Sequence, residues 1–188
     1  MRLFSGALLL AALPVAGQGG IRFDNRVPGR VVAPVFGAEL SDATLSFHGN
    51  PTNGYPSGSQ VYSGALLAGT NYTAELWGGP EGAQDCQLAS LARTFFQTGN
   101  NAGYVQPPAF PVIVPGVSAG ARAALQLRVW DNRGGAVVSW SQSECAPAAR
   151  GASGLFLTDP LPQTGGSVYL LGLQSVNIFN AMLQGRLE

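Results

Sequence analysis

Lysine is absent from the chain, and histidine occurs once, as His48. Charged residues make up only 11% of the sequence, with a formal net charge of zero. No excess of positive charge is available to hold nucleic acid or an anionic lipid surface. With one histidine and two cysteines a Cys/His zinc site cannot be assembled. No loop has the acidic spacing of a calcium site, and no glycine-rich loop precedes a helix to cradle phosphate. We therefore expect no metal, no cofactor and no nucleic-acid partner.

Long apolar runs are also scarce, and the clearest one lies at the start of the chain, over residues 3–15. Its length and the small residues after it are typical of a secretory signal peptide and too short for a membrane span. Val15 and Gly17 suit the −3 and −1 positions of a cleavage site. We expect a signal peptide over 1–17, cleavage after Gly17, and a secreted or envelope protein of bacterial origin without a membrane span. A buried N-terminal helix is the alternative.

Cysteine is limited to Cys86 and Cys145. An even count in an exported chain predicts a disulfide bond. It would close a loop of about 60 residues and contribute about 4 kcal/mol in the chain-entropy model. The alternative is two free thiols.

Glycine and proline are abundant, with 26 and 13 residues, yet 46% of the chain is hydrophobic. Many short apolar runs separated by turn formers indicate an all-β fold. The spacing predicts a single β-sandwich over 18–188, Ig-like or jelly-roll-like, with about eight to ten mostly antiparallel strands. The expected strands lie within 21–27, 31–37, 43–49, 71–82, 110–116, 123–130, 136–142, 155–162 and 167–179, with a long surface loop over 50–60. Residues 86–99 fit either a helix or a strand, and their second half, 93–97, favours a strand.

The clearest pattern is a predicted hairpin over 123–142. The first strand alternates so that Ala124, Gln126, Arg128 and Trp130 share one face, opposite Ala123, Leu125, Leu127 and Val129. Residues 131–135 supply turn chemistry, and 136–142 would return as the second strand.

A serine hydrolase signature, G-x-S-x-G, occurs around Ser118, between Gly116 and Gly120. A nucleophile elbow requires a helix directly after the serine. Here the following residues alternate with period two, which predicts a strand. His48 precedes the serine, whereas the elbow fold places its histidine after it. We interpret Ser118 as part of a turn and expect no catalytic residues.

Most acidic residues fall in predicted turns, but Glu75 lies on the predicted strand within 71–82, whose alternation places Thr73, Glu75 and Trp77 on one face and Tyr72, Ala74 and Leu76 on the other. A glycosidase needs only two suitably spaced carboxylates. Glu75 with a second acid therefore remains a catalytic alternative.

The tryptophans are the strongest candidates for ligand binding. Trp77, Trp130 and Trp140 could form a platform on which sugar rings stack, with Arg128 and Gln126 beside them. Whether Trp130 and Trp140 share a face depends on the register of the 131–135 turn. The alternative is that each indole covers an end of the core.

Several stretches in order, "GGIRFDNRV", "NYTAELWGGPEG", "FQTGNNAGYV", "VPGVSAGARAALQLRVWDN" and "LLGLQSVNI", resemble exported β-rich bacterial proteins often found with PEP-CTERM sorting tails. The resemblance implies an extracellular or envelope component without an assigned activity, and a turn around Ser118. The final residues, "NAMLQGRLE", lack the Pro-Glu-Pro motif, hydrophobic span and basic cluster of such tails. We therefore expect free secretion or attachment through partners.

Taken together, the sequence predicts an exported, non-catalytic structural or adhesive protein of the bacterial cell surface or extracellular matrix. Its expected partners are polysaccharide or other envelope proteins. The alternatives are a carbohydrate-binding module that uses the tryptophans and a secreted glycosidase.

Overall fold

The computed structural model describes residues 19–180, so the predicted signal peptide lies outside the described residues. Strands dominate this part of the chain, which confirms the all-β class. None of its helices is long and apolar enough to cross a membrane. The elements are β1 (Gly20–Ile21), β2 (Arg26–Val27), β3 (Val31–Val32), β4 (Val35–Phe36), β5 (Gly69–Pro80), η1 (Asp85–Gln87), β6 (Ala89–Phe96), η2 (Gly99–Asn101), β7 (Ala123–Asp131), η3 (Arg133–Gly135), α1 (Trp140–Cys145), β8 (Arg150–Ala152), β9 (Phe156–Leu157), β10 (Ser167–Val168) and β11 (Val176–Asn177).

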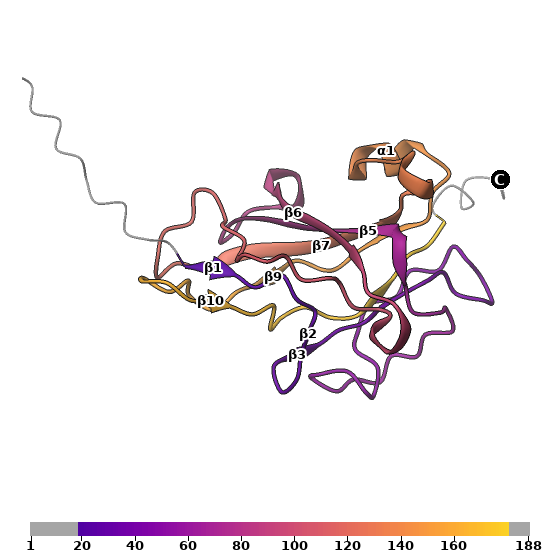
Figure 1. The fold of residues 1–188 in the computed structure, drawn as a ribbon, viewed down its shortest axis with the longest axis horizontal. Helices are drawn as coiled ribbons and strands as arrows, with labels where there is room; N and C mark the ends of the chain where they lie inside the picture. The colour runs from indigo at the N-terminus through magenta and orange to yellow at the C-terminus, as the bar shows by residue number, and fades with distance from the viewer. Residues whose placement is uncertain (1–18, 181–188) are drawn as a thin grey trace, which may run out of the picture.

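One five-stranded antiparallel sheet organises the molecule, in the order β6-β5-β7-β8, with β9 also paired to β7 (Figure 1). Alternation along β5 and β7 buries one face of this sheet in the core, through Ala74 and Leu76 of β5 and Leu125, Leu127 and Val129 of β7. The alternation expected for both strands is therefore confirmed. The opposite face, called the outer face below, carries the polar side chains and lies toward α1.

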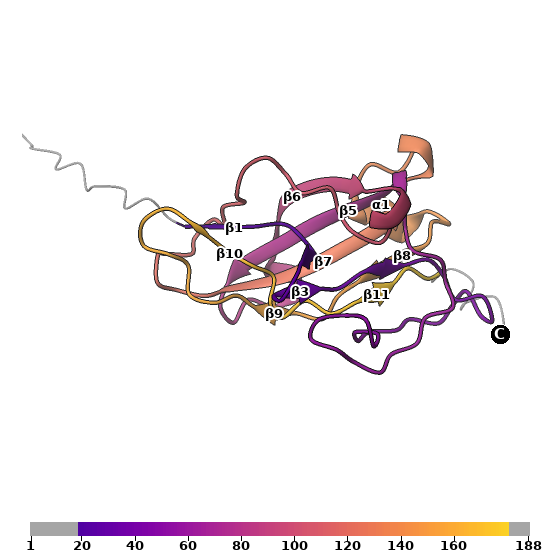
Figure 2. The ribbon, with the colours of Figure 1, turned by 60° about the horizontal axis from the view of Figure 1, so that its bottom comes forward.

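The other side of the core is built from short pairs of strands, seen below the sheet in Figure 1 and from another side in Figure 2. β2 and β3 are antiparallel, but β1 pairs with β10, and β4 with β11, in parallel. Each strand in these three pairs is only two residues long, so the pairs do not make a clear second sheet of a sandwich. Prolines such as Pro28 and Pro34 lack the backbone N–H that longer ladders require.

Two predicted strands are replaced by irregular backbone. Within 43–49 and 110–116, His48 and Val112 each form only an isolated bridge, to Val176 and Ile21 respectively. The loop expected over 50–60 is present, as part of a long irregular segment over 37–68.

Both edges of the large sheet are covered by irregular segments. Along β6, the Gln97 amide donates to the Tyr104 carbonyl (2.9 Å) and the Gln106 amide to the Phe95 carbonyl (2.8 Å). Along β8, Arg150 and Phe179 exchange two backbone hydrogen bonds (3.0 and 2.9 Å). The hydrogen-bonding groups that an edge strand normally presents to solvent are thus partly used inside the fold.

The predicted return strand over 136–142 is wrong, because β7 pairs with β8 and β9 and the chain between them forms α1. Ser139 is the N-cap of this helix, and its hydroxyl accepts a hydrogen bond from the Gln142 amide (3.2 Å). The Gln142 side chain in turn accepts from the Val138 amide (2.8 Å). Such local capping favours a helix over a strand.

The predicted disulfide is also wrong. Cys86 and Cys145 are both free and exposed. Each lies on its own short helix, η1 or α1, with its side chain toward solvent, so the fold holds the two elements by other contacts.

Ser118 lies in a turn, as expected. Gly116 and Gly120 have φ values of +75° and +83°, which glycine adopts without strain. β7 begins at Ala123, so a strand follows the serine where an elbow would need a helix.

Gly151 of β8 provides a test of how tightly the sheet approaches β11. A Cβ atom at this position would lie 2.2 Å from the Asn177 carbonyl oxygen, which is backbone and cannot move aside easily. Gly151→Ala is therefore expected to lower the free energy of unfolding by about 1–3 kcal/mol, measured by urea denaturation. Gly154→Ala is the matched control, because nothing lies within 4 Å of its Cβ position. Equal stability of the two variants would contradict this close approach.

Candidate functional site

The outer face of the sheet carries four of the five predicted binding residues, and the fifth, Trp140, lies beside it on α1, one of two short helices that border this face. Trp77 of β5 lies directly opposite Gln126 of β7, and Glu75 opposite Arg128. The loop after β5 carries η1, whose Asp85 contacts Arg128. The segment after β7 carries α1, whose Trp140 packs near the same arginine. Residues separated by up to 65 positions in the sequence therefore meet on one surface.

Glu75 is the centre of this surface and is only 1% exposed. Its Oε1 accepts hydrogen bonds from the Ser90 hydroxyl (2.7 Å) and from Nη2 (2.8 Å) and Nε (3.2 Å) of Arg93. Its Oε2 accepts from the Trp77 indole N–H (2.8 Å). A buried carboxylate needs such partners to offset its lost hydration. Both of its oxygens are thus engaged within the fold.

Arg128 lies between two indole rings and is also buried. Its Cζ is 3.9 Å from the centre of the Trp77 ring and 5.4 Å from that of Trp140. Its Nε donates to the Gln126 side-chain oxygen (2.6 Å) and its Nη2 to the Asp85 carboxylate (3.1 Å). Hydrogen bonds and cation–π contacts together hold the guanidinium in one place and set the spacing of the two indoles.

Trp130 does not belong to a ligand platform, contrary to the binding role expected for it. Its ring is 0% exposed and packs with Val137 and Ala148, and its indole N–H donates to the Val137 carbonyl (3.0 Å). It meets Trp140 at 71° between ring planes, so the two indoles are not coplanar. The alternative interpretation, in which the ring covers the sheet, is correct for Trp130.

Gln126 is likewise no ligand contact in this arrangement, because it is only 8% exposed. Its oxygen accepts from Arg128, and its amide nitrogen donates to the Ser153 carbonyl (3.2 Å). Gln126 therefore helps to hold the Arg128 guanidinium in position.

The partly exposed rings of Trp77 and Trp140 face a cavity of about 390 Å³, which we call the aromatic hollow. α1 supplies one wall of it and the outer face of the sheet the other. Its lining residues are Glu75, Trp77, Ser90, Arg93, Arg128, Ser139, Trp140, Ser141 and Glu144. The hollow thus combines two indoles with three serine hydroxyls and an exposed carboxylate, that of Glu144.

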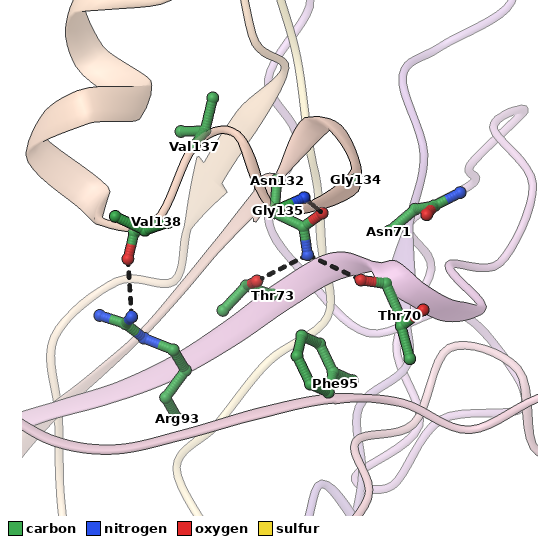
Figure 3. A pocket seen from close by; sticks show the side chains of 10 residues that line it. All are labelled: Thr70, Asn71, Thr73, Arg93, Phe95, Asn132, Gly134, Gly135, Val137 and Val138. Carbon is green, nitrogen blue, oxygen red and sulfur yellow. Dashed lines mark hydrogen bonds between the residues drawn. The ribbon is translucent and has the colours of Figure 1, made fainter.

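A second cavity of about 420 Å³, the amide hollow, lies beside it and shares Arg93 (Figure 3). Arg93 reaches from β6 to the Val138 carbonyl (2.6 Å), while the Asn132 amide donates to the Thr70 carbonyl and the Thr73 hydroxyl. Phe95 lies along β6 at the edge of this space. The full lining is Thr70, Asn71, Thr73, Arg93, Phe95, Asn132, Gly134, Gly135, Val137 and Val138.

A third hollow, of about 270 Å³, lies along the irregular segment and includes Tyr62 and Tyr104. Burial raises the pKa of both phenols, and for Tyr62 the negative charge of Glu39 raises it further. The Tyr62 hydroxyl donates to the carbonyls of Gly49 and Ser175 (2.8 and 2.9 Å). Tyr62 therefore serves to hold loops together, and its stacked partner Phe36 lies 4.1 Å away between ring centres.

Within residues 19–180, no three histidine, cysteine, aspartate or glutamate side chains gather as metal ligands.

The sequence did not point to Arg93, Phe95, Ser139, Ser141 or Glu144 as part of the site. The sequence pattern assigns Arg93 and Phe95 to a strand without a partner, and Ser139 and Ser141 to a return strand that does not form, while Glu144 lies just after that predicted strand. For Ser139, Ser141 and Glu144, the signal in the sequence is Ser139-Trp-Ser-Gln142, in which serine is followed three residues later by glutamine. This pattern is typical of the start of a helix.

No protein-family model, curated protein or solved structure matches this chain.

Proposed function

We propose that the protein is an exported, non-catalytic adhesive or structural protein of the bacterial cell surface or extracellular matrix. One observation carries this proposal: the two buried ionisable groups of the outer face, Glu75 and Arg128, are each held by an oppositely charged partner, while two indoles remain partly exposed. Glu75 is engaged by Ser90, Arg93 and Trp77, and Arg128 by Asp85. Ionisable groups held in this way fix the positions of neighbouring side chains, whereas acid–base catalysis needs a group that reaches the substrate.

Surface or extracellular placement rests on the predicted signal peptide and on the resemblance to exported β-rich proteins. In such a setting the expected partners are polysaccharide or other envelope proteins.

Binding of carbohydrate is the second candidate, and the aromatic hollow favours it. Sugar rings present C–H faces that pack against indole and hydroxyl groups that exchange hydrogen bonds with serine. Trp77, Trp140 and the three lining serines offer both kinds of contact in one cavity. Binding sites of this type are mostly apolar with a few well-placed polar groups.

The test is retention of the purified protein on a panel of insoluble polysaccharides and bacterial envelope fractions. A Trp77→Ala/Trp140→Ala double variant is expected to lose about tenfold or more in affinity, because aromatic anchors dominate such contacts. Phe110→Ala is the matched control, since Phe110 is an exposed aromatic (82%) outside both hollows. Because removal of Trp77 also takes a partner from Glu75, Ser141→Trp serves as a second variant that fills the hollow and leaves both indoles in place.

Failure of the wild-type protein to bind any fraction would overturn the adhesive proposal. Loss of binding with Phe110→Ala but not with the tryptophan variants would move the site elsewhere. Release of soluble sugar from the same polysaccharides, abolished by Glu75→Gln, would instead favour the glycosidase.

A further inference from the structure

The aromatic hollow and the amide hollow are both bordered by one strand, β6. The outer-facing residues Ser90, Arg93 and Phe95 follow one another along it, with Ser90 in the first hollow, Phe95 in the second and Arg93 in both. Ser90 and Phe95 pair with Trp77 and Thr73 of β5, which are four residues apart, so at the rise of a β-strand the two ends lie roughly 13 Å apart. A ligand that contacts both ends must therefore be an extended molecule.

The charges around the two hollows are neutralised within the fold. Arg93 pairs with Glu75 (2.8 Å) and Arg128 with Asp85 (3.1 Å). Glu144 adds an exposed negative charge to the wall of the aromatic hollow. No excess of positive charge is left here to attract an acidic polymer, and Glu144 repels one.

Each hollow also has its own aromatic surface and its own polar groups. Trp77 and Trp140 serve the first hollow together with serines. Phe95, which is partly exposed, serves the second together with Thr70 and Asn71. Between the two hollows lies the Arg93 side chain, which is 44% exposed. It donates a hydrogen bond to the Val138 carbonyl and so separates one hollow from the other.

From these observations we infer that the outer face binds an uncharged polysaccharide chain lying along β6, with one segment in each hollow and the Arg93–Val138 contact between them. The inference rests on the proposed adhesive function and deepens it by naming the ligand class and a second contact region. Phe95 is the residue that the second region adds, and Trp140 anchors the first.

Isothermal titration calorimetry tests this with uncharged cello-, xylo- and malto-oligosaccharides, each as a disaccharide and as a hexasaccharide, and with polygalacturonate as the acidic probe. For at least one sugar series, the hexasaccharide is expected to bind tenfold or more tightly than the disaccharide, with little dependence on salt. Phe95→Ala is expected to remove most of this gain in affinity and leave disaccharide binding unchanged. Trp140→Ala is expected to weaken both, and Phe110→Ala neither.

The outcomes separate this inference from the function on which it rests. Three results would overturn the proposal of an extended uncharged ligand. The first is equal affinity for the disaccharide and the hexasaccharide, and the second is a Phe95→Ala variant that still binds the hexasaccharide as much more tightly as the wild type does. The third is tighter binding of polygalacturonate than of the uncharged sugars. If Trp140→Ala still abolished binding in those cases, the adhesive function would stand. Absence of binding to every probe here and to every envelope fraction would overturn both.

Discussion

Replacement of Trp130 by alanine is expected to lower the free energy of unfolding by about 3–5 kcal/mol, as is usual for large buried aromatic side chains. The ring is wholly buried between the sheet and the segment that carries Val137 and Ala148. Its loss leaves a cavity and removes the donor to the Val137 carbonyl. Urea denaturation with intrinsic fluorescence or circular dichroism gives the measurement.

Trp140→Ala is the comparison that makes this result informative. Trp140 packs on the edge of the same cluster but is only partly buried, so its removal is expected to cost less than about 2 kcal/mol. The two variants separate an indole of the core from one that we propose contacts the ligand. If Trp140→Ala were the more destabilising of the two, the assignment of Trp130 to the core and of Trp140 to the site would be reversed.

Glu75→Ala is expected to cost about 2–4 kcal/mol, because it leaves Arg93 and the Trp77 indole N–H without their acceptor. The value falls below that of a fully enclosed pair because Arg93 remains partly hydrated and can bind water instead. Ser90 also loses its acceptor. The same denaturation experiment measures the loss.

Glu75→Gln controls for shape, since the amide keeps one oxygen acceptor but removes the charge. A loss of about half that of Glu75→Ala is expected, because the amide NH₂ group faces the Trp77 or Arg93 donors. A Glu75→Gln variant as stable as the wild type would mean that the carboxylate charge contributes nothing to folding. Glycan affinity is expected to change less than stability, because Glu75 acts by positioning Trp77 and Arg93.

The inner and outer faces of β5 and β7 could be predicted because alternation is local to each strand, whereas the pairing of these two distant strands was not predicted. Alternation of polar and apolar residues places Glu75 and Trp77 on one face of the first strand and Arg128 on the polar face of the second, and the structure brings these faces to the same side of the sheet. Both strands are long, and each has one apolar face that packs in the core, so a shift by one residue would turn that face away from the core. The meeting of Trp77 with Arg128 follows once the two strands pair.

The remainder of the site depends on contacts that the sequence pattern does not specify. The alternation around Val137 and Ser139 resembles a strand, but the capping interactions of Ser139 and Gln142 with the backbone favour a helix. The partner of Arg93 depends on the register of β6, which contains an irregularity between the residues paired with Leu76 and Trp77. A one-residue difference there would turn Arg93 away from Glu75.

The short parallel strand pairs could not be predicted from the sequence for a related reason. β1 pairs with β10 and β4 with β11 across most of the chain, and two-residue strands have no period to detect. Their pairing is set by packing of the core. The free cysteines show the same limit, because an even count says nothing about whether two exposed side chains on separate helices come within bonding distance.

The covered edges of the large sheet have a consequence for how copies of this protein could assemble. Fibres that grow by strand addition recruit a neighbour through free backbone groups at a sheet edge. Here residues 104–106 occupy one edge and Phe179 part of the other, so a neighbour would first have to displace them. A matrix containing this protein would then be held together by side-chain contacts or by a shared polymer, and its copies could separate without any one of them unfolding.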